Sequence, residues 1–220
     1  MWNNLSTFFG EDQKLLDEVK AASVIVPYRS GARIFGEQDT DDAVYCILEG
    51  EVRAVRYSEG GTEVWLDSFS TGSIFGEMAA LVDHVRTADT YALTDIAVAT
   101  MSGSAFITLI KTNGDLGHKV CRLLAARIHN TTRRVFEHAT LTATARIYAE
   151  LLRMANAGEE TSVVVIANMV PINDLATKLN IARETVSRTI SKLKDENILE
   201  ANGRDLAIIR PYDLVNRLHR

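Results

Sequence analysis

The stretch LNIARETVSRTISKLKDENIL, residues 179–199, has the apolar period of one amphipathic helix. Its buried face is predicted by three residues at helical spacing: Val186, Ile190 and Leu193. Arg183, Glu184 and Arg188 lie in the first two turns, on the other face. The alternative is that Glu184 and Arg188 pair with each other on a solvated face of the helix. Such a pair would stabilise the helix by only about 0.2–0.5 kcal/mol. We therefore expect the two arginines and the glutamate to bind something outside the protein.

The segments around this helix predict a winged helix-turn-helix. A short helix over residues 172–180 precedes it, and a tight connection at Asn180–Ala182 joins the two. The sequence ILEANGRDLAIIRP, residues 198–211, follows as a hairpin, in which Asn202 and Gly203 favour a type I′ turn. Helix, turn, helix and hairpin in this order are the parts of a winged helix-turn-helix.

Two further elements are expected upstream of the winged motif. Residues 161–167, TSVVVIA, are typical of a strand. Residues 141–158 predict a helix, with Thr142 as its N-cap and Gly158 as its stop. Both elements would complete a small domain at the C-terminal end of the chain.

A helix-turn-helix inserts its second helix into the DNA major groove, N-terminus first. There an arginine bridges guanine O6 and N7, and a glutamate accepts a hydrogen bond from the cytosine N4 amino group. The charge distribution agrees with DNA as the partner. Residues 111–220 hold 17 Lys and Arg against 12 Asp and Glu, whereas residues 1–110 hold 7 against 17. Only the second half has an excess of positive charge and therefore suits binding to DNA, a polyanion. The whole chain has a formal charge of −5.

The first half of the chain has the pattern of short β-strands separated by glycine turns. The β-rich runs are residues 23–28, 43–50, 51–57, 62–69 and 96–101. The separating glycines are Gly31, Gly50, Gly60, Gly61 and Gly72. This half is predicted to be an antiparallel barrel or sandwich, and the whole chain belongs to the α+β class.

Within this half, GSIFGEMAALVDHVRTADT, residues 72–90, contains the groups that would suit a small cyclic phosphate. Backbone N–H groups at Gly76–Met78 and the start of a short helix can bind the anion. Arg86 can place its guanidinium fork on phosphate oxygens, and Glu77 can accept from a sugar hydroxyl. The alternative interpretation is a surface ion pair between Glu77 and Arg86 beside a loop.

Residues 104–138 have the period of one long helix, which no proline interrupts. The recurring positions are Ile110, Val120, Leu124, Ile128 or Thr131, and Val135. A helix of about 30 residues is too long for one small domain to cover, so we expect its stripe to pack on a second copy of itself. Packing of the helix on its own barrel is the alternative.

The recognition-helix sequence, IARETVSRTISKLKDENIL, and the 72–90 motif resemble those of the cyclic-AMP receptor protein/FNR family of bacterial transcription regulators. The resemblance covers about residues 20–210. It implies that residues 1–138 form a cyclic-nucleotide-binding antiparallel β-roll with a dimerisation helix over about 104–138. It also implies that residues 139–220 form a winged helix-turn-helix DNA-binding domain.

The same resemblance assigns site residues. The cyclic nucleotide would be bound by Gly76, Glu77, Met78, Arg86, Thr87, Thr131 and Thr132. DNA would be bound by Arg183, Glu184, Ser187, Arg188 and, through phosphate, Arg204 in the wing. The chain departs from the family pattern at two positions. Ser187 is similar to the FNR branch, where the receptor proteins have glycine, and Gln38 replaces the family glycine before Asp39.

The resemblance further implies the ligand and the partners. Cyclic AMP is the expected effector, and cyclic GMP stays open because Thr87 resembles the threonine of cyclic-GMP-selecting kinase domains. The chain lacks the N-terminal cysteine cluster of iron–sulfur sensors and a Cys/His pair placed for haem. The expected partners are a second copy of the chain, a TGTGA-like pseudo-palindromic operator and RNA polymerase. The alternative is a family member that binds DNA without nucleotide or senses another signal.

Other classes of protein are not indicated. The five histidines and two cysteines form no nucleophile–base or metal-ligand pattern, so we expect neither an enzyme nor a metal site. Cys46 and Cys121 are read as small core or near-core residues. The apolar runs are far shorter than the ~20 residues that span a bilayer, and the start lacks a basic-then-apolar signal sequence. We therefore expect a cytoplasmic protein without a membrane partner.

Overall fold

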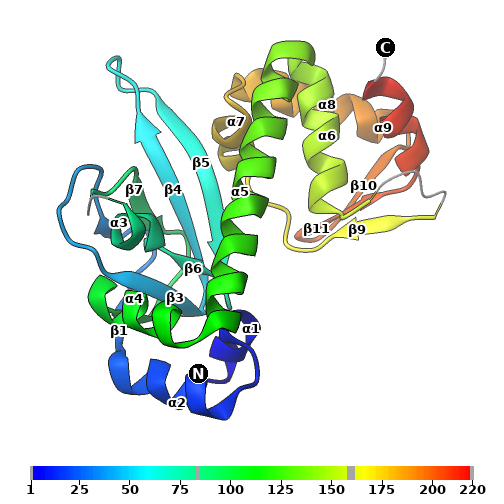
Figure 1. Ribbon diagram of the computed structural model, residues 1–220. Coiled ribbons are helices and arrows are strands. Elements are labelled where there is room, and N and C mark those ends of the chain that lie inside the picture. Colours follow the sequence, from blue (N-terminus) through cyan, green and yellow to red (C-terminus); the bar gives the residue numbers. More distant parts are fainter. Residues whose placement is uncertain (1, 83–84, 158–161, 219–220) are drawn as a thin grey trace. The chain divides into compact units, whose positions relative to one another are not determined.

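The computed structural model describes residues 2–82, 85–157 and 162–218 (Figure 1). Their contacts divide the chain into two compact units, Met1–Arg127 and Ile128–Arg220. The division falls inside the longest helix, α5 (Gly114–Thr140). In the described part of the chain no helix combines the length and the apolar character needed to cross a bilayer.

The first unit contains two four-stranded antiparallel sheets. One has the order β1 (Val24–Tyr28), β8 (Ile96–Met101), β3 (Val44–Glu49) and β6 (Ile74–Phe75). The other has the order β2 (Arg33–Phe35), β7 (Asp89–Ala92), β4 (Glu51–Tyr57) and β5 (Glu63–Ser70). One core cluster draws side chains from both sheets: Phe35, Tyr45, Ile47, Val52, Phe75, Ala92, Ile96 and Val98. The antiparallel β-fold predicted for this half is confirmed.

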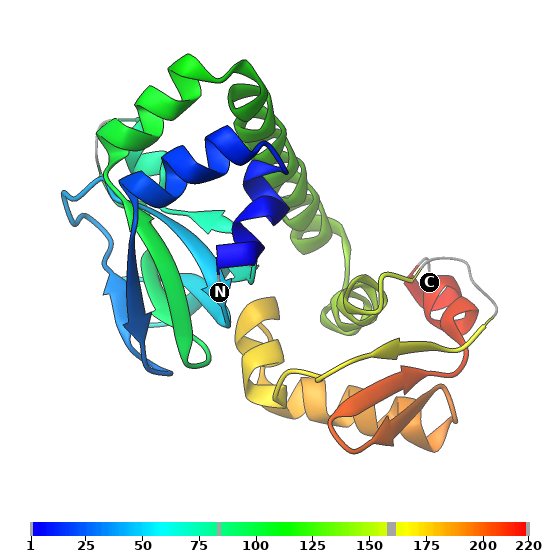
Figure 2. The same cartoon turned by 90° about the horizontal axis from the view of Figure 1, so that it is seen from below.

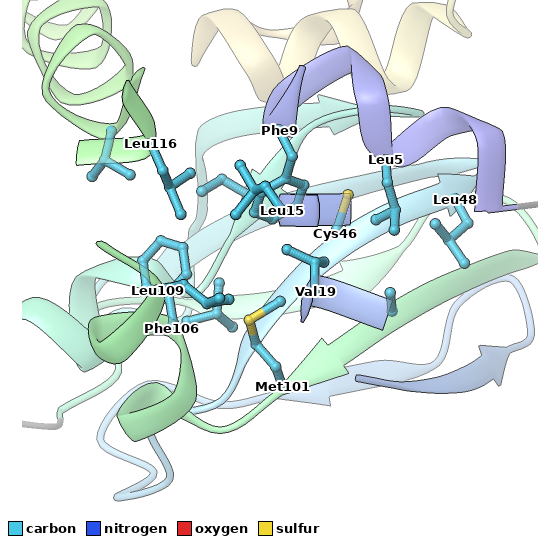
Figure 3. Close-up of a cluster of buried hydrophobic side chains, with 14 of the residues drawn as sticks. Leu5, Phe9, Leu15, Val19, Cys46, Leu48, Met101, Phe106, Leu109 and Leu116 are labelled. Carbon is cyan, nitrogen blue, oxygen red and sulfur yellow. The ribbon is translucent and has the colours of Figure 1, made fainter. Parts of the chain in front are cut away.

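A second core lies between the β1-β8-β3-β6 sheet and a layer of helices (Figure 3). The helices are η1 (Trp2–Leu5), α1 (Ser6–Phe9), α2 (Gln13–Ala22), α4 (Gly103–Thr112) and the first turns of α5. Leu5, Phe9 and Leu15 point from the N-terminal helices toward Cys46 on β3. The prediction that Cys46 is a core residue is confirmed, whereas Cys121 on α5 is exposed and that prediction was wrong.

The long helix expected over residues 104–138 is two helices, because Asn113 interrupts it. Asn113 has an extended backbone, with φ −128° and ψ 101°. Its side-chain oxygen accepts from the Leu116 N–H at 2.8 Å and so caps the helix that follows. Leu116 and Val120 are then buried in the first unit's core, whereas Ile128 further along α5 is 67% exposed. The start of the predicted stripe therefore packs on the chain's own unit.

The second unit is built on a three-stranded antiparallel sheet, whose strands lie side by side in Figure 2. Its order is β10 (Leu199–Asn202), β11 (Asp205–Ile208) and β9 (Val164–Ile166). The helices are the end of α5, α6 (Ala143–Met154), α7 (Ile172–Leu179), α8 (Arg183–Asp195) and α9 (Pro211–Leu218). Together α7, α8 and the β10–β11 hairpin form the predicted winged helix-turn-helix.

Thr142 and Gly158 are the predicted N-cap and stop of the first complete helix of this unit, α6. Thr142 caps α6, since its side chain accepts from the Ala145 N–H at 3.2 Å, which confirms the predicted N-cap. The helix ends at Met154, and Gly158, its predicted stop, lies outside the described residues.

The hairpin turn differs from the prediction by one residue. Asn202 pairs with Asp205, so the two loop residues are Gly203 and Arg204. Gly203 has φ 62°, and Arg204 is not among the residues with positive φ. A positive φ only at the first loop position, taken by glycine, is the pattern of a type II′ turn and not of type I′. The prediction failed because Asn-Gly was taken as the turn, whereas the register makes Asn202 the last paired residue.

Candidate functional sites

Arg86 is a buried cation in the first unit, although it lies in a loop before β7. The residue is only 2% exposed. Its Nη1 donates to the Gly76 carbonyl at 2.9 Å, and its Nη2 donates to the Ala43 carbonyl at 2.8 Å. The guanidinium carbon lies 4.0 Å from the centre of the Phe35 ring. These contacts fix both the position and the plane of the guanidinium.

The remaining edge of the Arg86 fork faces Asp41. Nε donates to Asp41 Oδ2 at 3.2 Å, and Nη2 donates to Asp41 Oδ1. The Asp41 side chain is 47% exposed, so the buried arginine meets a carboxylate that reaches solvent. The pKa of the neighbouring Tyr45 is raised to about 12, mainly by burial and next by the negative charge of Asp41. The Tyr45 side chain beside Arg86 is therefore uncharged at neutral pH.

Gly76 places the start of α3 (Glu77–Leu81) against Arg86. It adopts a left-handed conformation, with φ 79°. A Cβ atom here would lie 2.9 Å from the Ala43 carbonyl oxygen and 2.7 Å from Arg86 Nη1. Because both are closer than real Cβ contacts allow, only glycine fits between the strand and the arginine.

Glu77 is fully buried, and its two carboxylate oxygens have different surroundings. Oε1 accepts from Nη1 of Arg127, on α5. Oε2 is buried and has no hydrogen-bond partner among the described residues. Burial raises the pKa of Glu77, and the Arg127 charge opposes that rise. A buried carboxylate oxygen without a donor is costly, so it marks a place where a bound molecule with a hydroxyl or amino group would be stabilised.

Arg127 is a site residue that the sequence did not indicate. It also donates from Nη2 to the Ile74 carbonyl at 2.8 Å, and its guanidinium carbon lies 4.9 Å from the Phe69 ring centre. It is 50 positions from Glu77 along the chain, so no local spacing could have connected the two.

The other residues predicted for the ligand site lie at the surface. Met78 on α3 is 45% exposed, and Thr87, directly after Arg86, is exposed as well. Thr131 and Thr132 are exposed on the part of α5 that belongs to the second unit. The structure thus brings together Gly76 and Arg86, with Glu77 next in the chain, while the roles of Met78 and the three threonines stay predictions.

The second unit presents the predicted DNA-reading residues on one surface. Val186, Ile190 and Leu193 are buried in the core of this unit, as predicted. On the opposite side a hollow of about 330 Å³ is lined by Ile172, Arg183, Glu184, Ser187 and Arg188. Arg183, Glu184 and Arg188 are exposed, and Ser187 is half-buried. Arg204 is exposed at the tip of the β10–β11 hairpin, at the position expected for a wing contact.

The helix-turn-helix geometry follows from the connection between α7 and α8. Asn180 ends α7 in a left-handed conformation, with φ 50°, and Ile181 N–H donates to the Ala176 carbonyl at 3.0 Å. α7 has no side-chain cap at Pro171, and α8 has none at Ala182. The first N–H groups of α8 thus have no side-chain cap at the helix end that carries the two arginines.

A charged network ties the end of α5 to α6 and α7 within the second unit. Glu150 on α6 is 1% exposed and pairs with Arg153. Glu150 Oε1 lies 2.8 Å from Nζ of Lys178 on α7. Arg153 Nη2 also donates to both carboxylate oxygens of Glu137 on α5, at 2.7 and 2.9 Å. The network therefore connects three helices through one buried carboxylate.

Comparison with known proteins matches both units to domain families. Residues 25–113 match the cyclic nucleotide-binding domain, and residues 145–217 match the Crp-like helix-turn-helix domain. The cAMP-activated global transcriptional regulator CRP of Pasteurella multocida is 27% identical over 183 residues, 82% of this chain and 88% of that protein. The chain belongs to the CRP/FNR family of transcription regulators.

Solved structures of this family share the fold. A CooA mutant from Carboxydothermus hydrogenoformans has a TM-score of 0.79 at 19% identity, covering 91% of this chain and 89% of that one. The regulator CLP of Xanthomonas campestris, described as responsive to c-di-GMP, has a TM-score of 0.73 at 22% identity, with 90% and 99% covered. The CRP/FNR architecture of a β-sheet domain, a long helix and a helix-turn-helix is therefore established for this chain.

One departure from the family pattern has a structural outcome. Gln38, in the place of the family glycine, has φ 70°, a conformation that favours glycine. Its N–H donates to the Arg86 carbonyl at 3.0 Å. The turn is therefore kept without glycine, and the loop that carries Asp41 stays attached to the backbone of Arg86.

Proposed function

We propose that this CRP/FNR protein is a homodimeric regulator whose affinity for operator DNA is raised by a cyclic nucleotide, with cyclic AMP as the first candidate and cyclic GMP as the second. The observation that carries the proposal is that Gly76 accepts from a buried arginine, Arg86, while the next residue, Glu77, has a buried carboxylate oxygen without a donor among the described residues. A cyclic nucleotide has the two complementary groups, a phosphate anion and a ribose hydroxyl.

The assignment of each residue follows from this chemistry. Arg86 neutralises the phosphate, and Gly76 gives it close access to the backbone. Glu77, held by Arg127, accepts from the sugar hydroxyl through Oε2. Thr131 and Thr132, which the family resemblance places at the nucleobase, complete the proposed contacts, together with Met78 and Thr87. The protein acts in the cytoplasm, without a membrane or metal.

Dimerisation is supported by the unpaired apolar side chains of α5. Ile128 and Val135 are 67% and 65% exposed and lie seven residues apart, at coiled-coil spacing. Phe136 beside them is 65% exposed. A parallel pair of α5 helices would bury this stripe and give the protein two recognition helices. The operator is then a TGTGA-like pseudo-palindrome, with half-sites about one DNA turn apart. On such an operator the dimer would contact RNA polymerase.

The proposed domain boundary, residues 1–138 and 139–220, lies where the charged network begins. Glu137 on α5 holds Arg153, and through Glu150 the contact continues to Lys178 on the helix-turn-helix. A ligand that stabilises α5 near Thr131 would therefore bias the position of α7 and α8. This is a thermodynamic linkage, so operator DNA must raise nucleotide affinity by the same factor by which nucleotide raises DNA affinity.

A fluorescence-anisotropy titration of a TGTGA-type palindrome tests the proposal. At fixed salt, saturating cyclic AMP should tighten binding by about 5- to 150-fold, the usual range of an allosteric coupling. Cyclic GMP in a parallel titration distinguishes the two candidates. A scrambled duplex of the same length controls for non-specific charge attraction. Equal operator affinity with and without either nucleotide would reject ligand gating.

A second prediction concerns the recognition helix. Arg183→Ala should lose about 1–3 kcal/mol of discrimination at one guanine of each half-site, because a bidentate contact to a base edge is lost. Nucleotide affinity should not change. Lys192→Ala is the matched control, since Lys192 is exposed on the same helix, about two and a half turns from its start, and pairs with Glu196 at 4.0 Å. Competition with single-base operator variants measures the loss. A uniform weakening over all variants would show that Arg183 contacts phosphate.

One observation favours an alternative function. Asp41 pairs with Arg86 through both of its carboxylate oxygens. In the alternative, the carboxylate permanently replaces the ligand phosphate, and the protein binds its operator without nucleotide or responds to another signal. The same titration separates the two functions, since the alternative requires tight operator binding with no added nucleotide.

A further inference from the structure

The hydrogen bonds of Arg86 leave little capacity for a ligand. Of its five N–H donors, Nε and one of Nη2 are given to Asp41, the second of Nη2 to the Ala43 carbonyl, and one of Nη1 to the Gly76 carbonyl. One Nη1 N–H has no acceptor among the described residues. A phosphate that is bound by a single N–H would lose the bidentate geometry that makes arginine effective.

The Nε–Nη2 edge is the part of Arg86 that a phosphate can reach. The two carbonyl contacts and the Phe35 ring hold the guanidinium from the protein interior. The Asp41 side chain, in contrast, is 47% exposed and covers the edge from the solvent side. Removing this carboxylate would uncover two parallel donors without disturbing the contacts that hold the arginine in place.

We propose that Asp41 is an internal competitor for the anion-binding edge of Arg86, which the ligand phosphate must displace. The inference rests on the proposed function of this site. The phosphate can bind only when the interaction between Asp41 and Arg86 is broken, so this interaction lowers the affinity for the ligand. Asp41 then sets the ligand concentration to which the protein responds. It also holds the charge of a buried arginine compensated while the site is free of ligand.

The displacement has a defined structural cost. Asp41 Oδ1 also accepts from the Ala43 N–H at 3.3 Å, so a departing carboxylate gives up this bond as well as the two to Arg86. Since the side chain is half exposed, water can replace these bonds once it swings outward. The competition is therefore strong enough to weaken ligand binding and weak enough for a nucleotide to overcome.

Asp41→Asn tests the inference, because it removes the charge and keeps the shape. Isothermal titration with cyclic AMP should show binding tightened on the order of tenfold, within the range of close charge pairs. The matched control is Asp39→Asn. Asp39 lies in the same loop, and its carboxylate accepts from the Gly36 N–H at 2.7 Å. The Asp39→Asn substitution removes one negative charge from the same loop, as Asp41→Asn does. A general electrostatic effect on ligand affinity would therefore appear in both variants.

Inorganic phosphate is the second probe, and it does not depend on the nucleotide. Thermal stabilisation by millimolar phosphate should be larger for Asp41→Asn than for the wild type or Asp39→Asn. If cyclic AMP binds all three proteins equally, the inference is overturned and the proposed function stands. If no protein binds cyclic AMP or cyclic GMP, the proposed function fails, and the phosphate series decides alone. Equal stabilisation of the three proteins by phosphate would then overturn the inference as well.

Discussion

Arg86→Leu should weaken the binding of cyclic AMP by about 30-fold to several thousand-fold, which corresponds to about 2–5 kcal/mol for truncating one partner of a buried charged hydrogen bond. The loss is large because Arg86 is buried and its position is fixed by two backbone carbonyls. A phosphate in this site would then face a leucine and two unpaired carbonyl oxygens. Calorimetric titration at constant salt measures the effect.

The fold should survive this substitution better than ligand binding does. Asp41, the anionic partner of Arg86, is half exposed and can turn to water when the arginine is removed. The matched control is Arg56→Leu, because Arg56 lies in the same unit, pairs with Glu37 and has a side chain that is 57% exposed. The control should change the affinity less than about threefold, as expected for a screened surface charge. A threefold loss or less with Arg86→Leu would show that the anion binds elsewhere.

Arg86→Lys separates charge from geometry in the same experiment. Lysine keeps the positive charge but has no planar fork for the phosphate. Its ammonium also cannot donate to the Ala43 and Gly76 carbonyls and to a ligand in the fixed directions that guanidinium allows. We therefore expect an affinity between those of the wild type and Arg86→Leu.

The strands of the first unit could be predicted where they were long enough to show a pattern. β3, β4, β5 and β8 have six to eight residues each and match the predicted runs. β6 has two residues and β2 has three, which is too short for alternation to be recognised. Both strands are stabilised by pairing with strands that are distant in sequence. The local periodicity of a sequence does not reveal such pairing.

The ligand site was predictable only in its local part. Gly76, Glu77 and Arg86 belong to one stretch of sequence, and their spacing indicated a phosphate site. Arg127 and Asp41, which pair with Glu77 and Arg86, are 50 and 45 residues away from them. Such contacts depend on how the sheets and α5 pack, so they could be found only in the folded structure.

The recognition helix was predicted almost completely, because the spacing of its apolar face is a local property of the sequence. α8 begins at Arg183 and buries Val186, Ile190 and Leu193, as the period required. The break at Asn113 shows the limit of the same reasoning. The helical period of the sequence continues across Asn113. The Asn113 side chain nevertheless accepts a hydrogen bond from the Leu116 N–H, and a new helix starts there. Capping by asparagine competes with helix continuation, and periodicity alone does not reveal which prevails.

Arg153→Ala should lower the stability of the second unit by about 2–3 kcal/mol. Removing one partner of a buried ion pair typically costs about 3–5 kcal/mol, and the cost is smaller here because the Arg153 side chain is 26% exposed. Without Arg153, the Glu150 carboxylate, whose side chain is 2% exposed, would retain Lys178 as its cation. Glu137 on α5 would also lose the two hydrogen bonds that attach it to α6.

The two units can be followed separately, since both tryptophans of the chain, Trp2 and Trp65, belong to the first. Far-ultraviolet circular dichroism records both units, so the second unit is followed by the part of that signal whose transition differs from the tryptophan transition. For a unit of this size, the loss should lower the melting temperature of that part by roughly 10–20 °C. The transition recorded by tryptophan fluorescence should stay where it is in the wild type. Arg133→Ala is the matched control, because Arg133 lies 3.8 Å from Glu137 and is 41% exposed. If both variants melt at the same temperature, Glu150 does not depend on Arg153, and the network cannot be what connects α5 to the helix-turn-helix.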